Sequence, residues 1–293
     1  MSVTAILVSY NSSRVLPDAI GSLLTQPEIA RIIVVDNASM DGTCALVKEK
    51  FLSVEIIKGT ENIGFGRANN LALETITTEY ALLINPDATL DEGCTRALLD
   101  VMQENPECAI AAPTLYDANG KMLESYKRNV FDREKNKYKY VPPEGNACAD
   151  FLSGAVWLLR MEHFKASGFF NPDLFLYYED DDLCMTAHAN GFSLILCPEA
   201  RARHNMGTSS DAAGDLRALK QHHLMLSRLI IEEKYHGKIA ATKLAKKWYR
   251  RYALQAFGAF ITFQMRRLRI YTARLSGIVK YREEKALRSI RVD

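Results

Sequence analysis

Polar side chains follow four short segments at the points where apolar, strand-like sequence ends. The four polar groups are Ser9-Tyr10-Asn11, Asp36-Asn37-Ala38-Ser39, Asn62-Ile63-Gly64-Phe65-Gly66-Arg67 and Asn85-Pro86-Asp87. In an open α/β sheet, ligands bind at the carboxyl ends of the strands. Asn and Asp also end strands and cap helices, so any one group alone has a structural explanation. Four groups converging on one edge predict a ligand-binding site.

Two of the side chains have the chemistry of metal ligands. Asp87 follows a predicted strand, and a carboxylate there suits a Mg²⁺ or Mn²⁺ ion that bridges to a diphosphate. His204 follows the last predicted strand, and a neutral imidazole could complete the metal shell with Asp87. Each also has a structural alternative, because Asn-Pro-Asp forms turns and a lone His is more often structural.

A run of four carboxylates, Glu179, Asp180, Asp181 and Asp182, follows Tyr177 and Tyr178. Acidic residues favour helix N-termini, which accounts for one or two of them but not for the aromatic flank. Crowded carboxylates raise one another's pKa, which helps one of them act as a base near neutral pH. The run therefore predicts a general base that deprotonates a hydroxyl.

Two common nucleotide sites are excluded by their spacing. Gly64-Phe65-Gly66 begins like G-x-G-x-x-G, but the sixth position is Asn69 and the segment does not follow the first strand. The chain has no G-x-x-x-x-G-K-[ST] motif. We therefore expect neither a nicotinamide cofactor nor a P-loop.

The first 115 residues alternate strand and helix patterns, which indicates βαβ units and a mostly parallel sheet flanked by helices. The predicted strands are Val3–Ser9, Ile32–Asp36, Val54–Lys58, Tyr80–Asn85 and Ala109–Pro113. The predicted helices between them are Val15–Thr25, Gly42–Phe51, Gly66–Thr75 and Gly93–Glu104. Later we expect a loop over Lys121–Tyr140, strands Phe151–Arg160 and Ser193–Cys197, and a helix Tyr178–Gly191.

The end of the chain differs in pattern and charge. Residues 1–210 carry 18 Lys and Arg against 28 Asp and Glu, whereas residues 211–293 carry 19 against 7. We expect a helix over Ala218–Tyr235, a longer one from Lys238 to about Arg274, and a frayed end from Tyr281. The sequence thus predicts an α/β domain over 1–210 and a basic helical tail over 211–293 that faces an anionic partner or pairs subunits.

Six motifs in order resemble the family 2 inverting glycosyltransferases, and within them the rhamnosyltransferase-like branch. The residues are Val8-Ser9-Tyr10-Asn11, Val34–Thr43, Asn62–Asn70, Leu82–Ala88, Gly168–Cys184 and Pro198–His204. The resemblance covers about residues 3–210 and implies a single Rossmann-like domain of the GT-A type. Within the fourth motif, Asn85-Pro86-Asp87 stands where the family has D-x-D, with Asn85 in place of the first Asp.

The resemblance also implies roles for the polar groups. Tyr10 and Asp36 would contact the nucleotide of a nucleoside-diphosphate sugar, with Asn62, Gly64 and Arg67 around its base and ribose, and Ser9, Asn11, Asn37 and Asn85 beside them. Asp87 and His204 would hold Mg²⁺ or Mn²⁺. Asp180 would be the base, with Asp181 or Glu179 as alternatives. The branch points to dTDP-rhamnose, or else a UDP-sugar, and to a glycan or lipid-linked acceptor of a bacterial surface polysaccharide.

Compartment is predicted from cysteines and apolar segments. The six cysteines form no C-x-x-C pair, which favours free buried thiols in a reducing compartment. We expect no signal peptide and no transmembrane helix, since the longest candidate, Tyr252–Met265, has only 14 residues. Its Lys and Arg flanks fit a helix on the inner face of a membrane, and packing on the domain or a homodimer is the alternative.

Three other functions fit the residues less well. A nucleotidyltransferase would carry a Gly-rich, basic loop after its first strand, where this chain has Ser9-Tyr10-Asn11-Ser12-Ser13. The tail has no nucleic-acid recognition motif, so no nucleic-acid partner is expected. A module without activity would not need Asp87, Asp180 and His204 together.

Overall fold

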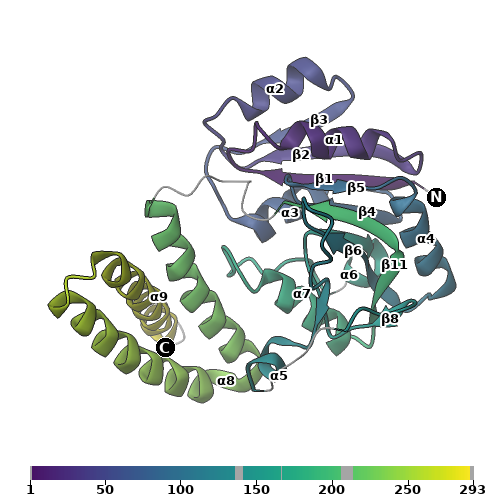
Figure 1. Cartoon of the computed structure of the whole chain (residues 1–293). Coiled ribbons are helices and arrows are strands. Elements are labelled where there is room, and N and C mark those ends of the chain that lie inside the picture. Colours follow the sequence, from purple (N-terminus) through teal and green to yellow (C-terminus); the bar gives the residue numbers. More distant parts are fainter. Residues whose placement is uncertain (1, 136–140, 166, 206–213, 291–293) are drawn as a thin grey trace. The chain divides into compact units, whose positions relative to one another are not determined.

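The structure is a computed structural model that describes residues 2–135, 141–165, 167–205 and 214–290 (Figure 1). The chain divides into two compact units. The first contains residues 1–171 and 180–211, and the second contains residues 172–179 and 212–293. The predicted domain boundary after residue 210 lies outside the described residues.

A nine-stranded sheet forms the centre of the first unit, in the order β3-β2-β1-β4-β10-β6-β11-β5, with β8 beside β11. Its strands are β1 (Val3–Ser9), β2 (Ile29–Asp36), β3 (Val54–Lys58), β4 (Tyr80–Ile84), β5 (Ala88–Leu90), β6 (Cys108–Tyr116), β8 (Ala147–Cys148), β10 (Val156–Arg160) and β11 (Ser193–His204). Strands β3, β2, β1 and β4 are parallel to one another, and β11 is parallel to β6. The mostly parallel α/β sheet that the sequence predicts is confirmed.

Helices cover both faces of this sheet because successive strand residues point to opposite sides. In β1, Val3, Ala5 and Leu7 join one buried cluster, and Ile6 and Val8 join the other. The helices α1 (Leu16–Leu24), α2 (Thr43–Lys50) and α4 (Cys94–Glu104) pack on the first cluster. The helices α3 (Phe65–Leu73), α6 (Met161–Lys165) and α7 (Glu179–Ala189) pack on the second.

One segment that the sequence predicts as a single strand forms two strands in the structure. The segment Phe151–Arg160 splits into β9 (Phe151–Leu152), which pairs with β7 (Tyr126–Lys127), and the antiparallel strand β10. The apolar pattern alone did not show this break. It falls at Ser153, Gly154 and Ala155, which are small enough to continue a strand. The predicted loop over 121–140 contains β7 and α5 (Val130–Lys135), and residues 136–140 lie outside the described part.

Strand β10 is fixed in the sheet by a buried arginine. Arg160 is 6% exposed, and its Nε donates to the carbonyl of Cys108 at 3.2 Å. Its Nη1 donates to the hydroxyl of Tyr80 at 3.1 Å, and its Nη2 donates to the carbonyl of Met102. A buried charge needs such partners, since leaving it unpaired would cost several kcal/mol. These bonds join β10 to β4, β6 and α4.

The second unit is built from helical segments that pack side by side. Helix α8 (Gly214–Ile261) is interrupted at Gly237, whose φ is 84°, and α9 (Met265–Ile290) returns after a turn at Phe263, whose φ is 54°. The predicted interruption between Tyr235 and Lys238 is confirmed. The predicted continuous helix from Lys238 to Arg274 is wrong because the chain reverses between 261 and 265. The helix also continues past Tyr281, where fraying was expected.

The core of this unit comes from both helices. Its buried members are Met225, Leu226, Leu229, Ala241, Ala245, Tyr252, Ile278 and Tyr281. The Tyr281 hydroxyl donates to Glu233 at 2.8 Å, and Arg274 Nε donates to Gln221 at 2.7 Å. No helix within the described residues has the length and apolar character needed to cross a membrane.

Candidate active site

The ends of β1 and β2 bring two buried polar side chains together. Ser9 and Asp36 are paired in the sheet register, and the backbone N–H of Asn37 donates to the carbonyl of Ser9 at 2.8 Å. Asp36 is 1% exposed, and one carboxylate oxygen accepts from the N–H of Ser39 at 3.3 Å. Its other oxygen, Oδ1, accepts no hydrogen bond from the described residues. A buried acceptor of this kind is suited to a ligand's donor group.

The side chain of Asn37 fixes the loop that leads into α3. Its amide nitrogen donates to Oδ1 of Asn62 at 2.9 Å and to the carbonyl of Gly64 at 3.3 Å. Its amide oxygen accepts from the N–H of Ile63 at 2.9 Å. The structure therefore brings three of the predicted site residues together: Asn37, Asn62 and Gly64. The hydrogen bonds of the Asn37 side chain shape the loop.

The residues after β1 adopt an unusual backbone. Asn11 has a φ of 54°, its N–H donates to Ser39 Oγ at 2.9 Å, and its Oδ1 accepts from the N–H of Met40 at 2.7 Å. Tyr10 next to it is 37% exposed, and Arg67 is also exposed, on α3. Of the predicted nucleotide-site residues, these two present the largest side chains to solvent.

The ends of β4 and β11 bring Asp87 and His204 into contact. Strand β5 pairs with β11 so that Ala88 lies opposite His204. The Nε2 atom of His204 lies 3.3 Å from Oδ1 of Asp87, and the N–H of Asn205 donates to the carbonyl of Asp87 at 3.0 Å. Both side chains are mostly buried, at 14% and 4% exposure. Two residues that lie far apart in the sequence, at positions 87 and 204, thus form one polar pair.

This pair offers two atoms that could ligate a cation, a carboxylate oxygen and an imidazole nitrogen. Within the described ranges, no group of three or more His, Cys, Asp or Glu is placed to hold a metal ion. Mg²⁺ is usually bound by one or two protein groups together with substrate phosphates and water. A carboxylate oxygen and an imidazole nitrogen in contact fit that pattern. Residues 206–210, which follow this pair in the sequence, lie outside the described residues.

The turn between β9 and β10 lies beside Asn85 and contacts the acidic run. The N–H of Asn85 donates to the carbonyl of Ala155 at 2.8 Å. The N–H of Gly154, the preceding residue, donates to Oδ2 of Asp180 at 3.2 Å. A Cβ atom on Gly154 would lie 2.4 Å from the Asp180 carboxylate, so any other residue there would displace that carboxylate. Gly154 is a site residue that the sequence interpretation missed.

The four acidic residues differ in their surroundings. Asp180 is half-buried, while Asp181 and Asp182 are 5% and 2% exposed. Glu179, the first residue of α7, is also buried and belongs to the second compact unit. Of the candidate bases in the first unit, Asp180 is the more accessible.

The two tyrosines before the acidic run have left-handed backbone conformations. Tyr177 has a φ of 67° and Tyr178 a φ of 66°. Such values are uncommon for side chains of this size and persist where surrounding contacts hold them. Burial raises the pKa of the Tyr177 hydroxyl, and the charge of Glu179 raises it further. Two consecutive residues of this kind mark a constrained segment directly before the acidic run that starts at Glu179.

A second motif pair is joined through Asn70. Its side-chain amide donates to the carbonyl of Phe170 at 2.8 Å and accepts from the N–H of Phe170 at 3.0 Å. A Cβ on Gly66 would lie 2.8 Å from Cβ of Phe170, so α3 approaches this loop closely. The sequence contained these residues in two motifs but gave no sign that they touch.

The cysteines are all free. Four are buried as predicted, but Cys44 is half-buried and Cys148 is exposed, so the expectation that every thiol is buried is wrong. Burial raises the pKa of the Cys44 thiol, and the neighbouring Asp36 carboxylate adds to the rise.

Comparison with known proteins identifies the family of this chain. A family model described as glycosyl transferase family 2 matches residues 4–168, and the chain belongs to that family. The protein is a glycosyltransferase with the GT-A fold.

Curated relatives include rhamnosyltransferases. The chain is 25% identical over 234 residues to N-acetylglucosaminyl-diphospho-decaprenol L-rhamnosyltransferase of Mycobacterium tuberculosis (strain CDC 1551 / Oshkosh), covering 69% of this chain and 74% of that protein. It is 25% identical over 225 residues to rhamnosyltransferase WbbL of Escherichia coli (strain K12), covering 69% and 83%. The resemblance to the rhamnosyltransferase-like branch is confirmed.

Solved structures share the fold at low identity. Staphylococcus aureus TarS 1-349 with UDP-GlcNAc is 17% identical, with a TM-score of 0.57, covering 97% of this chain and 92% of that one. The mannosyltransferase PcManGT from Pyrobaculum calidifontis, in complex with GDP-Man and Mn²⁺, is also 17% identical with a TM-score of 0.57, covering 97% and 87%.

Proposed function

We propose that this glycosyltransferase transfers a sugar from a nucleoside diphosphate to an acceptor hydroxyl with inversion at the anomeric carbon. The observation that carries the proposal is the chain of contacts at the end of β4. Asp87 contacts His204 at 3.3 Å, Asn85 is bonded to Ala155, and the next residue, Gly154, is bonded to Asp180. A cation-binding pair and an accessible carboxylate thus lie around one strand end.

Asp180 is the proposed general base. It is half-buried, and the N–H of Gly154 donates to its Oδ2, which orients the carboxylate. The acceptor oxygen bonds to the anomeric carbon as its proton passes to Asp180, and the bond from that carbon to the diphosphate oxygen breaks. One displacement inverts the centre. Asp181 and Glu179, the alternatives, are both more buried.

Asp87 and His204 are the proposed protein ligands of Mn²⁺ or Mg²⁺. When bound, the cation would neutralise charge on the leaving diphosphate. Asn85 would support the turn rather than ligate, since its backbone bonds to Ala155 and Ala88 fix it there. Mn²⁺ in the PcManGT complex supports a divalent cation in this fold.

The nucleotide is proposed to lie over the ends of β1 and β2. Asp36 Oδ1 and Ser9 Oγ are buried acceptor and hydroxyl atoms without partners among the described residues. Tyr10 and Arg67 would cover the base and ribose, and Asn11, Asn37, Asn62 and Gly64 would shape the walls. The hydrogen bonds that join Asn37 to Asn62, Ile63 and Gly64 support these roles.

The donor and acceptor classes follow from the relatives. Two of them are rhamnosyltransferases, and one is named for a diphospho-decaprenol acceptor. We therefore propose dTDP-rhamnose as the donor, with a UDP-sugar as the alternative, and a lipid-linked or glycan acceptor in polysaccharide synthesis. The enzyme would meet a lipid-linked acceptor at the cytoplasmic face of a membrane. The alternative role of the tail is to pair two copies of this chain.

The test is thermal unfolding with a panel of nucleoside diphosphates and their sugars, with and without Mn²⁺. A ligand that binds only the folded protein raises Tm. We expect one nucleotide to raise Tm in a cation-dependent way. Transfer of labelled sugar from the matching donor, with NMR assignment of the product anomer, then tests inversion. Retention of configuration would contradict Asp180 as the base of a single displacement.

A further inference from the structure

The turn between α8 and α9 exposes bulky apolar side chains. Phe263 is 86% exposed and Leu254 is 73% exposed. We name the following exposed residues the apolar tip: Leu254, Phe257, Phe260, Ile261, Phe263 and Met265. Large apolar patches on soluble proteins mark sites that bind something else. The turn therefore presents an interaction surface.

The apolar tip is not part of the core of its own unit. Leu254, Phe257 and Ile261 follow one another at spacings of three and four, so they share one face of α8. Tyr252, Ala256 and Ala259 are buried on another face. The helix thus has an apolar face for its partner helix and a second apolar face that solvent covers.

Positive charge surrounds this tip. Residues 238–282 contain 12 Lys and Arg and no Asp or Glu. We name the exposed arginines on either side of the tip the basic collar: Arg217, Arg250, Arg251, Arg266, Arg267 and Arg269. Three of them, Arg217, Arg266 and Arg269, line a cavity of about 410 Å³ that also contacts Met265. The collar and the tip are therefore contiguous.

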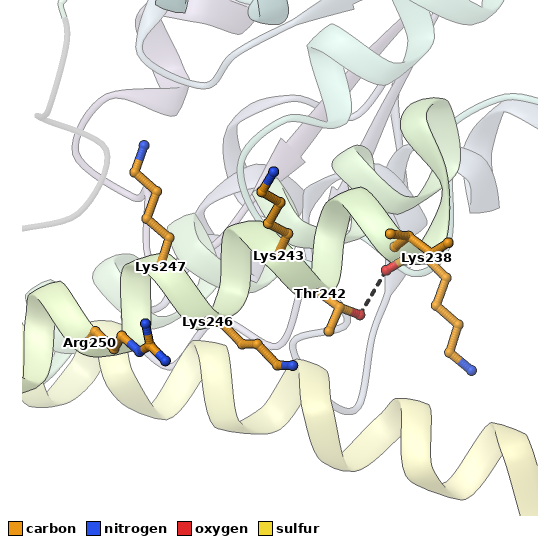
Figure 2. A pocket seen from close by; sticks show the side chains of 7 residues that line it. Lys238, Thr242, Lys243, Lys246, Lys247 and Arg250 are labelled. Carbon is orange, nitrogen blue, oxygen red and sulfur yellow. Dashed lines mark hydrogen bonds between the residues drawn. The ribbon is translucent and has the colours of Figure 1, made fainter.

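A second basic hollow lies on α8, at residues 238–250, before the apolar tip in the sequence (Figure 2). Its volume is about 730 Å³, and its charged lining is Lys238, Lys243, Lys246, Lys247 and Arg250. Lys243 and Lys247 extend in the same direction in Figure 2. Lys243, Lys247 and Arg250 continue, at the same three- and four-residue spacing, into Leu254, Phe257 and Ile261. After Gly237, one stripe of α8 is thus basic over residues 243–250 and apolar over residues 254–261.

We propose that the apolar tip inserts into a lipid bilayer and that the basic collar binds the anionic head groups around it. Apolar side chains gain free energy on leaving water for the acyl boundary, and each Lys or Arg near an anionic surface adds attraction. A second copy of this chain is a poorer occupant, because it would bring two surfaces of the same charge together. A nucleic acid would leave the exposed phenylalanines unused. The inference goes beyond sugar transfer and stands on the second unit alone.

The experiment is flotation of the full chain with vesicles of phosphatidylcholine, with or without about 30 mol% phosphatidylglycerol. We expect binding to the anionic vesicles to be about tenfold or more stronger, and to fall as salt rises. The double variant Phe257→Ser/Phe263→Ser should lose about tenfold or more in partition, given the free energy of burying two Phe side chains. The matched control Leu52→Ser removes an apolar side chain that is 92% exposed outside the tip and should bind as the parent does.

Insertion depth is measured in a single variant. Phe263→Trp should add a fluorescence component that brominated acyl chains quench in anionic vesicles and that the parent protein, with Trp157 fully buried and Trp248 packed against the core of the second unit, lacks. Unchanged binding of a folded Phe257→Ser/Phe263→Ser protein would overturn the proposal, as would absence of quenching. Two other results would overturn it. One is a double variant that changes the oligomeric state of the protein but not its binding to vesicles. The other is tighter binding of the protein to DNA than to vesicles at the same salt.

Discussion

The backbone N–H of Gly154 donates to Oδ2 of Asp180 at 3.2 Å, and a Cβ on Gly154 would stand 2.4 Å from that carboxylate. The two residues are joined because the chain breaks its strand between β9 and β10. Any other residue at 154 would push the carboxylate of Asp180 aside. The position of the proposed base is thus set by the absence of a side chain on another element.

Gly154→Ala should lower kcat by about tenfold or more while changing the donor KM little, since misplacing a base affects the chemical step. Asp180→Asn should lower kcat further because it removes the base itself. Gly145→Ala is the matched control, because a Cβ there meets nothing within 4 Å. Steady-state kinetics would tell these apart, and a Gly154→Ala enzyme with parental kcat would rule out the positioning role.

Asp87→Asn should abolish the cation-dependent part of nucleotide stabilisation, because an amide keeps the size of the side chain and loses its charge. His204→Ala should weaken it in the same direction. Asp91→Asn is the control, since Asp91 is also acidic and lies 3.5 Å from Arg203 on β11. The measurement is the Tm shift by nucleoside diphosphate with Mn²⁺ and with a chelator. Equal shifts in parent and Asp87→Asn would refute the metal assignment.

Asn37→Ala should raise the donor KM more than it lowers kcat, since the side chain shapes the loop through Asn62, Ile63 and Gly64. The loss of these buried bonds should also cost about 1–3 kcal/mol of stability. Asn119→Ala, in an exposed turn, should change neither. Urea unfolding together with donor titration tests both effects. A stable variant with parental KM would show that the network does not position the donor.

Two helical glycines predict opposite effects in the second unit. A Cβ on Gly277 of α9 would lie 2.2 Å from the carbonyl oxygen of His222, so Gly277→Ala should destabilise the helix pair by about 2 kcal/mol or more. Gly258 of α8 has nothing within 4 Å, so Gly258→Ala should be neutral or stabilise by up to about 1 kcal/mol. Helical circular dichroism during urea unfolding compares them. The packing argument fails if both alanines have the same effect.

The stability of the segment before Asp180 should depend on pH. The ring of His223 stacks on Phe175 with centroids 4.4 Å apart, and Ser227 Oγ donates to the carbonyl of Leu176 at 2.8 Å. Burial, and then the neighbouring His222, lower the pKa of His223 to about 4. The unfolded chain takes up this proton below about pH 6.5 and the folded chain does not, so stability falls as the pH falls from 6.5 to 4.

Because His223 is only partly buried, we expect the loss between pH 7.5 and 5 to be about 1 kcal/mol. His223→Phe keeps an aromatic ring against Phe175 and removes the titration, so the pH slope of its stability should be shallower. Urea unfolding at several pH values measures both slopes. Parallel slopes for parent and variant would show that His223 does not carry this dependence.

Much of the fold follows from local pattern. Strands β1 and β3 begin and end where the sequence predicts because each is a short apolar run between polar turns. The break inside 151–160 and the reversal at 262–264 escaped prediction. Ser153-Gly154 is a dipeptide that favours turns, but the apolar residues on both sides of it predicted one continuous strand. Thr262-Phe263-Gln264 reverses the chain with a left-handed phenylalanine, which local propensity disfavours.

The sequence by itself determined the residue types of the candidate site and the strand ends on which most of them lie, since hydrophobic periodicity fixes where strands stop. Only the tertiary structure decided which of them touch. The antiparallel pairing of β5 with β11 brings His204 to Asp87, and the β9–β10 turn brings Gly154 to Asp180. The same holds for the apolar tip: the sequence predicted an apolar stretch over Tyr252–Met265, and the packing of α8 on α9 decided which of its side chains face solvent. Contacts between residues far apart depend on register and packing, which no local pattern records.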